Sequence, residues 1–146
     1  MADFEKAGLL TLRGNRVLLC RKKHSTSLLI LPGGVKERNE SAEQCLLREL
    51  AEELADCHPG PLTYLATYLS PAAVPGKTVQ IELFTAELSG TPQPASEIKE
   101  LIWFGPGDDP ALLAPSLRDL IFPDMIHRGV LPAAILANAI QSYRCL

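Results

Sequence analysis

The chain has 146 residues, of which 47% are hydrophobic, and we expect residues 1–146 to form one domain with a substantial core. The formal net charge of −3 argues against general affinity for nucleic acid or for an anionic membrane. The N-terminus carries acidic residues where a leader would be basic and then apolar, and no apolar run reaches membrane-spanning length. We therefore expect a cytoplasmic protein with neither a nucleic acid polymer nor a membrane as partner, and this composition leaves a small anionic ligand open.

The first third of the chain predicts strands. Residues 7–12 and 17–22 are apolar runs on either side of a polar turn, which is typical of a β-hairpin. Residues 28–31 form a short continuous apolar run of the kind found in buried strands. This strand leads into the Pro-Gly-Gly turn at residues 32–34, where bare backbone can approach a metal or an oxyanion.

A helix follows this turn and is predicted to run to about Asp56. Ser41 and Gln44 stand at capping-box spacing, which makes Ser41 the expected N-cap. Leu46, Leu50 and Leu54 fall on one stripe at about 100° per residue, with Leu47 beside it. We expect this stripe to dock the helix on a sheet.

The second half predicts further strands at residues 62–69, 79–88 and 101–104, separated by loops at 57–61, 71–77 and 89–96. From about residue 110 to 129 the chain reads as helical, with interruptions near Pro115 and Pro123, and a last helix is predicted over 132–143. Strands on both sides of a central helix indicate an α+β fold in layers. The last helix has hardly a charge, so we expect it to pack on the domain, with a homodimer contact as the alternative.

Three acidic residues project together beside the apolar stripe of the central helix: Glu49, Glu52 and Glu53. Residues three and four apart are neighbours on a helix, and like charges there cost about 0.2–0.5 kcal/mol per pair. Convergent carboxylates suit Mg²⁺ or Mn²⁺, which prefer oxygen ligands and are often shared with substrate phosphates. The alternative is an ordinary solvated acidic face. The glycine turn just upstream favours the metal site, because it would place a carbonyl beside the acids.

These residues match a known pattern at the required spacing: Gly34, Glu40, Arg48, Glu49, Leu50, Glu52 and Glu53. The region resembles the signature of the Nudix hydrolases, G-x5-E-x7-R-E-U-x-E-E-x-G-U, where U is bulky and aliphatic. Ala55 and Asp56 depart from its last two positions. The resemblance implies a Nudix-type α/β/α sandwich with a central mixed β-sheet and C-terminal helices. It also implies Mg²⁺-dependent hydrolysis of a nucleoside diphosphate linked to another group, by attack of water on phosphorus.

The resemblance also implies roles for individual residues. Glu49, Glu52 and Glu53 would bind Mg²⁺, or alternatively Mn²⁺, with the Gly33 carbonyl as a further ligand. Gly34 would let the backbone approach the substrate, and Arg48 with Glu40 would brace the loop and orient a glutamate. Glu97, six residues before Trp103, is the candidate general base; the alternative for Glu97 is a solvated loop acid.

Substrate contacts are predicted at the end of the strand over 17–22. Arg21 and Lys22 would grip phosphates there, unless they form an ordinary solvated strand end. Aromatic residues in strands, such as Trp103, are candidates for stacking on a base but more often belong to a core. Pro71 resembles a marker of ADP-ribose-cleaving members, whereas the short chain resembles members that cleave nucleoside triphosphates. The alternative function is a catalytically lapsed Nudix-fold module that binds nucleotides or regulates, for which the departures at Ala55 and Asp56 are the motive.

Overall fold

The computed structural model describes residues 2–24, 28–72 and 74–137. The strands are β1 Phe4–Leu10, β2 Leu12–Arg13, β3 Arg16–Lys22, β4 Gly33–Val35, β5 Leu54–Pro59, β6 Thr63–Pro71, β7 Thr78–Thr85, β8 Leu88–Pro94 and β9 Ile98–Phe104. The helical segments are α1 Ala42–Glu53, a 3-10 turn at Pro110–Leu112, a π-helical turn at Leu117–Ile121, α2 Phe122–His127 and a 3-10 turn at Ala133–Leu136.

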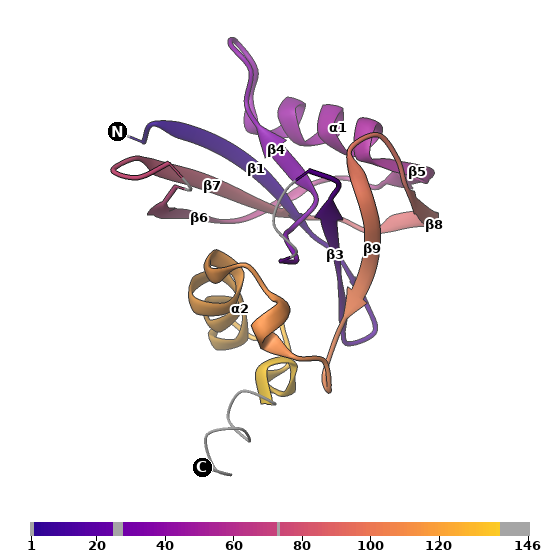
Figure 1. Cartoon of the computed structure of the whole chain (residues 1–146). Helices are drawn as coiled ribbons and strands as arrows, with labels where there is room; N and C mark the ends of the chain where they lie inside the picture. Colours follow the sequence, from indigo (N-terminus) through magenta and orange to yellow (C-terminus); the bar gives the residue numbers. More distant parts are fainter. Residues whose placement is uncertain (1, 25–27, 73, 138–146) are drawn as a thin grey trace.

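Among the described residues the strands form three sheets. One has the order β4-β1-β7-β6, the second β2-β3-β9 and the third β5-β8. Strands β1 and β7 are parallel and the other pairs are antiparallel. Helix α1 lies on one side of the strands, and α2 lies on the other with the C-terminal turns (Figure 1). The predicted α+β class with a mixed sheet and helices on two sides is confirmed.

The predicted hairpin forms only at its tip. Strand β2 pairs with β3 through Leu12 and Arg13, whereas β1 pairs with β4 and β7 in another sheet. The chain changes sheet at Thr11, which is buried and whose hydroxyl donates to the carbonyl of Ala86 at 2.6 Å. This bond satisfies the buried polar group at the crossing point, as burial requires.

Helix α1 begins as predicted and ends earlier. Ser41 is the N-cap, and both bonds of the capping box with Gln44 are present. The helix ends at Glu53 rather than near Asp56, because Leu54 already has extended dihedrals and starts β5. Leu46 and Leu50 are buried against the sheet, whereas Leu47 is 46% exposed.

Two predicted loops are strands, which corrects the prediction for residues 57–61 and 89–96. Strand β5 pairs with β8 in a two-stranded ribbon, where every strand is an edge and proline is tolerated. A bulge between Ala55 and Cys57 breaks the register, and Asp56 has a φ of 61° there. Gly90 faces the bulge, where a Cβ would lie 2.4 Å from the Asp56 carbonyl oxygen.

The predicted strand at 28–31 is also wrong. Its described residues make isolated bridges between Cys20 and Ile30 and between Leu29 and Leu113. Leu29 is buried and the other three residues are half-buried, because the run lies between two segments rather than within one sheet. Periodicity does not distinguish these two arrangements. The strand in this region is β4, which contains the two glycines predicted to be a free turn.

The C-terminal segment is helical with shorter elements than predicted. Pro123 does not interrupt it, because a π-helical turn over residues 117–121 runs directly into α2. The wider turn accommodates a proline, which has no N–H and whose ring clashes with the carbonyl four residues back. The predicted helix over 132–143 begins as a 3-10 turn, and its continuation past residue 137 lies outside the described residues. No helix in the described part is long and apolar enough to cross a membrane.

A hydrogen-bond network ties α2 to β6. The Tyr68 hydroxyl donates to Asp124 at 2.6 Å, and Arg128 contacts both Asp124 at 3.0 Å and the carbonyl of Leu65 at 3.0 Å. This network fixes the C-terminal helical segment over the face of the sheet that carries Leu83 and Ala66.

Replacing Tyr68 by Phe should therefore lower the free energy of unfolding by about 1.5–3 kcal/mol, the usual worth of a hydrogen bond to a charged group. Urea denaturation measures this change. The matched control is Tyr64→Phe, because the Tyr64 side chain is exposed, and we expect a loss below about 0.5 kcal/mol there. Equal losses in the two variants would contradict the assignment.

Candidate active site

Strand β4 brings its two glycines against both β1 and α1. Gly33 has a φ of 140°, and a Cβ there would lie 2.1 Å from the carbonyl oxygen of Ala7. At Gly34 a Cβ would lie 2.5 Å from the carboxyl carbon of Glu49. Only glycine permits this approach, so the two glycines allow the acids of α1 to lie directly against strand backbone.

Glu53 is the most deeply placed of the signature acids. Glu53 is only 4% exposed, and its Oε1 accepts the N–H of Gly33 at 2.9 Å. The other oxygen lies 3.9 Å from the ammonium of Lys22. Burial raises the pKa of Glu53 to about 7, although the Gly33 N–H and Lys22 act in the opposite direction. A buried acid with a raised pKa beside a pocket is a candidate functional residue.

Arg48 organises the other acids of the signature. Its Nε and Nη2 donate to the two oxygens of Glu40 at 2.8 and 3.0 Å, a bidentate pair. Its Nη1 donates to Glu49 at 2.9 Å and lies 3.7 Å from Glu52. Arg48 also reaches the carbonyl of Val35 at 3.3 Å. Arg48 and Glu40 are therefore placed to brace β4 and orient Glu49.

The Arg48 and Glu40 pair should appear in acid denaturation. The guanidinium of Arg48, followed by the N–H of Glu37, lowers the pKa of Glu40 to about 2 from a usual value of about 4.3. A depressed folded-state pKa stabilises the fold above the unfolded pKa, and this stability is lost as pH falls toward the folded value. We expect wild type to exceed Glu40→Gln in urea midpoint at pH 7 and to lose that advantage between about pH 5 and pH 2. A constant difference across this range would contradict the ion pair.

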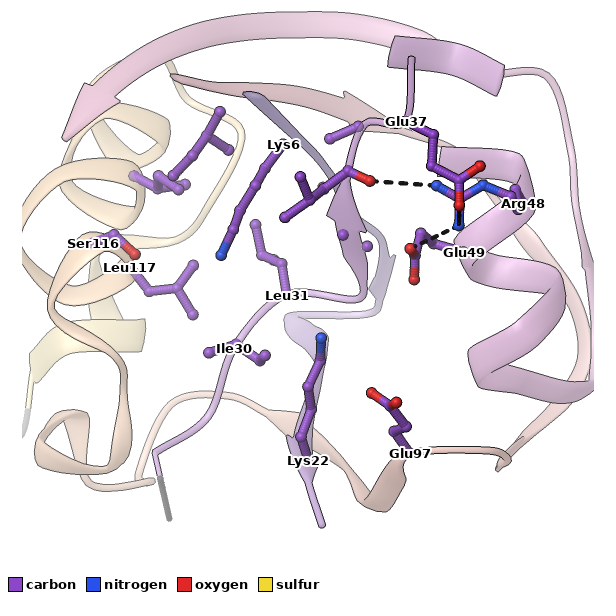
Figure 2. A pocket seen from close by; sticks show the side chains of 17 residues that line it. Lys6, Lys22, Ile30, Leu31, Glu37, Arg48, Glu49, Glu97, Ser116 and Leu117 are labelled. Atoms are coloured by element: carbon purple, nitrogen blue, oxygen red, sulfur yellow. Dashed lines mark hydrogen bonds and ion pairs between the residues drawn. The ribbon is translucent and has the colours of Figure 1, made fainter. Parts of the chain in front are cut away.

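A pocket of about 340 Å³ opens beside these residues. Figure 2 shows Lys22 and Glu97 on one side, Glu49 and Arg48 beside α1, and Lys6 and Ser116 toward the C-terminal segment. Its lining consists of Lys6, Ala7, Gly8, Lys22, Ile30, Leu31, Gly33, Gly34, Val35, Glu37, Arg48, Glu49, Ile81, Glu97, Ser116, Leu117 and Ile121. The pocket thus joins the signature residues to a largely aliphatic wall.

The structure separates the two predicted phosphate-binding residues. Lys22 lines the pocket, whereas the adjacent Arg21 does not and forms an ion pair with Glu100 of β9. Successive residues of a strand point to opposite sides, and a bulge between the two also shifts the register. Glu97, the candidate general base, also lines the pocket, and its carbonyl accepts the N–H of Lys23 at 2.8 Å.

The three predicted metal ligands are not preassembled. Within the described ranges no group of three or more His, Cys, Asp or Glu residues is arranged to hold a metal ion. Glu49 and Glu53 lie against β4, whereas the Glu52 side chain is 55% exposed on the adjoining arc. The side chains of Glu49, Glu52 and Glu53 still offer carboxylate oxygens, the donors that a hard divalent ion prefers. Buried Glu53 has one cation, Lys22, within 4 Å among the described residues.

Several lining residues escaped the sequence reasoning. The aliphatic wall comes partly from Leu117 and Ile121, which carry no functional signature. Lys6 shares a face of β1 with Gly8 and Leu10 but is exposed, and an exposed lysine near the start of a strand carries no functional signal in the sequence. None of the described lining residues is aromatic. Tyr68 and Phe104 are core residues, and Trp103 lies under the guanidinium of Arg13.

Comparisons with known proteins show the family of the chain. The profile of the NUDIX domain matches residues 5–122. A search of curated proteins finds no match. The E. coli ORF135 protein is similar in structure with a TM-score of 0.68 and 29% identity, covering 91% of this chain and 96% of that one. A MutT NUDIX hydrolase from Burkholderia pseudomallei has a TM-score of 0.68 and 27% identity, over 79% and 92% of the two chains.

A nudix hydrolase family member from Chromobacterium violaceum shares the fold, with a TM-score of 0.70 and 21% identity over 96% of this chain and 87% of that one. The chain therefore belongs to the Nudix family of hydrolases, which act on pyrophosphate bonds of small nucleotide-type substrates and generally use divalent cations. The resemblance inferred from the signature is confirmed.

Proposed function

We propose that this chain is a Mg²⁺-dependent pyrophosphohydrolase that cleaves a nucleoside diphosphate linked to another group. The observation that carries the proposal is the junction of β4 with α1. There Glu53 accepts the Gly33 N–H, Glu49 abuts Gly34, and Glu49 opens directly into the pocket. The net charge of −3 supports a small-molecule partner rather than a nucleic acid polymer, and we retain the cytoplasm as the proposed location.

Glu49, Glu52 and Glu53 would hold Mg²⁺ together with the carbonyl of Gly33. When bound, Mg²⁺ neutralises phosphate oxygens and lowers the pKa of water. Arg48 orients Glu49 through its 2.9 Å bond and is itself fixed by Glu40. Because Nη1 of Arg48 also approaches Glu52, the arginine controls how freely these two acids turn toward a ligand.

Lys22 and Glu97 supply the chemistry on the other side of the pocket. The Lys22 ammonium points into it and would contact a phosphate oxygen (Figure 2). Glu97 would accept the proton of the attacking water at its carboxylate. A backbone hydrogen bond from the N–H of Lys23 to the carbonyl of Glu97 holds the end of β3 beside the start of β9. This bond keeps Lys22 close to Glu97.

The departures at Ala55 and Asp56 remove none of the signature acids, because both residues lie in β5, after Glu53. Asp56 adopts a φ of 61° at the bulge of β5, a left-handed conformation that aspartate tolerates better than most residues. The alternative is a lapsed module that binds nucleotides. Two observations support it: Arg48 already occupies an oxygen of Glu49, and the acids are not arranged as a metal site among the described residues.

The test is incubation of the purified protein with Mg²⁺ and, separately, Mn²⁺. The panel contains nucleoside triphosphates, ADP-ribose, nucleotide sugars and dinucleoside polyphosphates, with product analysis and an EDTA control. EDTA-sensitive cleavage of one class is the expected result. Nucleotide binding without cleavage of any compound, in folded protein, would favour the lapsed module.

A further inference from the structure

Lys6 lies near the start of β1 and lines the pocket. It pairs with Ile81 in β7 and with Val35 in β4, in the interior of the sheet order β4-β1-β7-β6. Ala7 and Leu9 face α1, so Lys6 faces the opposite side, toward the C-terminal segment. Its neighbours in the pocket include Ile81 and Leu117, which are aliphatic. Lys6 itself is exposed, so its ammonium is available to a ligand that enters the pocket.

Lys6 has no charged partner among the described residues. No ion pair within 4.0 Å and no side-chain hydrogen bond joins Lys6 to another described residue. Lys36, which directly follows β4, by contrast pairs with Glu5 at 3.8 Å. Lys6 and Lys22 enter the pocket from different strands, and both ammonium groups point into it (Figure 2). Desolvation in the pocket, followed by the positive charge of Lys22, lowers the pKa of Lys6.

Two lysines that repel each other across one pocket favour an anion between them, because a negative group there relieves the repulsion. The third nearby cation, Arg48, is already bound to Glu40 and Glu49. A phosphate chain is the anion that the Nudix reaction brings to this pocket.

We propose that Lys6 is a substrate-binding residue that holds the phosphate chain together with Lys22 and makes the pocket select nucleoside triphosphates over diphosphates capped by a neutral sugar. A third phosphate adds negative charge that both lysines can contact, whereas a sugar leaves one lysine facing an uncharged group. The absence of aromatic residues among the described lining residues is consistent with recognition by charge more than by stacking. This inference rests on the proposed function, whose substrate class it names.

The kinetic test compares wild type with Lys6→Met and Lys6→Arg. With a nucleoside triphosphate, Lys6→Met should raise KM about 10- to 100-fold, the effect of losing one charge-assisted contact, and should change kcat little. Lys6→Arg keeps the charge and should stay within about threefold of wild type. With the matching nucleotide sugar, Lys6→Met should change KM less than about threefold. The control is Lys77→Met, because Lys77 pairs with Asp3 outside the pocket.

A binding test without turnover keeps this inference separate from the proposed function. Titration calorimetry with tripolyphosphate in EDTA should show binding to wild type that is about tenfold weaker in Lys6→Met and unchanged in Lys77→Met. Lys6→Gln replaces Lys6→Met if circular dichroism shows that the methionine variant does not fold.

Each outcome is decisive. Lys6-dependent binding of tripolyphosphate in a protein that cleaves nothing on the panel would overturn the proposed function and leave the anion site standing. If the protein cleaves a substrate, and neither KM nor the affinity for tripolyphosphate changes in Lys6→Met, the anion site alone is overturned. The anion site would also be overturned if the KM increase in Lys6→Met depended on which base the nucleotide carries and not on its number of phosphates.

Discussion

Replacing Glu53 by Gln should abolish turnover while leaving the fold intact. The amide oxygen of glutamine can still accept the Gly33 N–H that Glu53 accepts at 2.9 Å, so the junction of β4 and α1 is retained. The charge required of a metal ligand is lost. We expect kcat/KM to fall at least about 100-fold, which corresponds to about 2.7 kcal/mol of transition-state stabilisation.

The same variant should not be less stable than wild type at pH 8 in EDTA. Burial raises the pKa of Glu53 to about 7, so the protonated form is the one the fold favours. A raised folded-state pKa of an acid contributes stability below its unfolded value, which is lost as pH rises through about 7. Glutamine removes that loss. A urea midpoint that stays equal or rises, together with lost activity, is the expected combination.

The matched control for this experiment is Glu43→Gln, because Glu43 lies exposed in the first turn of the same helix. Its kcat/KM should remain within about twofold of wild type, as for a surface substitution. Wild-type activity in Glu53→Gln would contradict the assignment of Glu53 as a metal ligand. A fall in both variants would point to a general effect of charge on α1 instead.

Replacing Gly33 by Ala should cost about 2–5 kcal/mol of stability. The φ of 140° is strained for any L side chain, and the new Cβ would lie 2.1 Å from the carbonyl oxygen of Ala7. Because the clash is with backbone, β4 must move away from β1, and the N–H that Glu53 accepts moves with it. Activity should fall with stability.

Gly14→Ala is the control for this prediction. Gly14 also has a positive φ, 62°, but a Cβ there meets nothing within 4 Å. The expected cost is about 1–2 kcal/mol, from the left-handed conformation alone. Urea denaturation of the two variants side by side measures the difference, and equal costs would show that β4 can shift freely.

The helix and its chemistry were predictable because their determinants are local. Ser41 and Gln44 form the capping box three residues apart, and Arg48, Glu49 and Glu53 follow at fixed spacing on one helix. Pairs at these separations meet on any regular helix, so their contacts follow from the sequence order. Arg48 accordingly contacts both Glu49 and Glu52.

The strands of the second half were harder to predict because their pairing is remote. Residues 54–59 and 88–94 carry prolines and glycines that indicate loops, yet they pair with each other across about 30 residues of chain. A two-stranded ribbon tolerates such residues, because each strand needs hydrogen bonds on one edge only. No local pattern reports this pairing.

The sequence by itself determined the family, the start of α1 and the set of acids, since each depends on residue type at short spacing. Only the tertiary structure decided which side chains share the pocket: that Lys22 enters it while Arg21 pairs with Glu100, and that Lys6 joins from β1. These placements depend on strand register and on the bulge after Arg21. A shift of one residue in a strand turns every side chain to the other face, and long-range pairing sets that register.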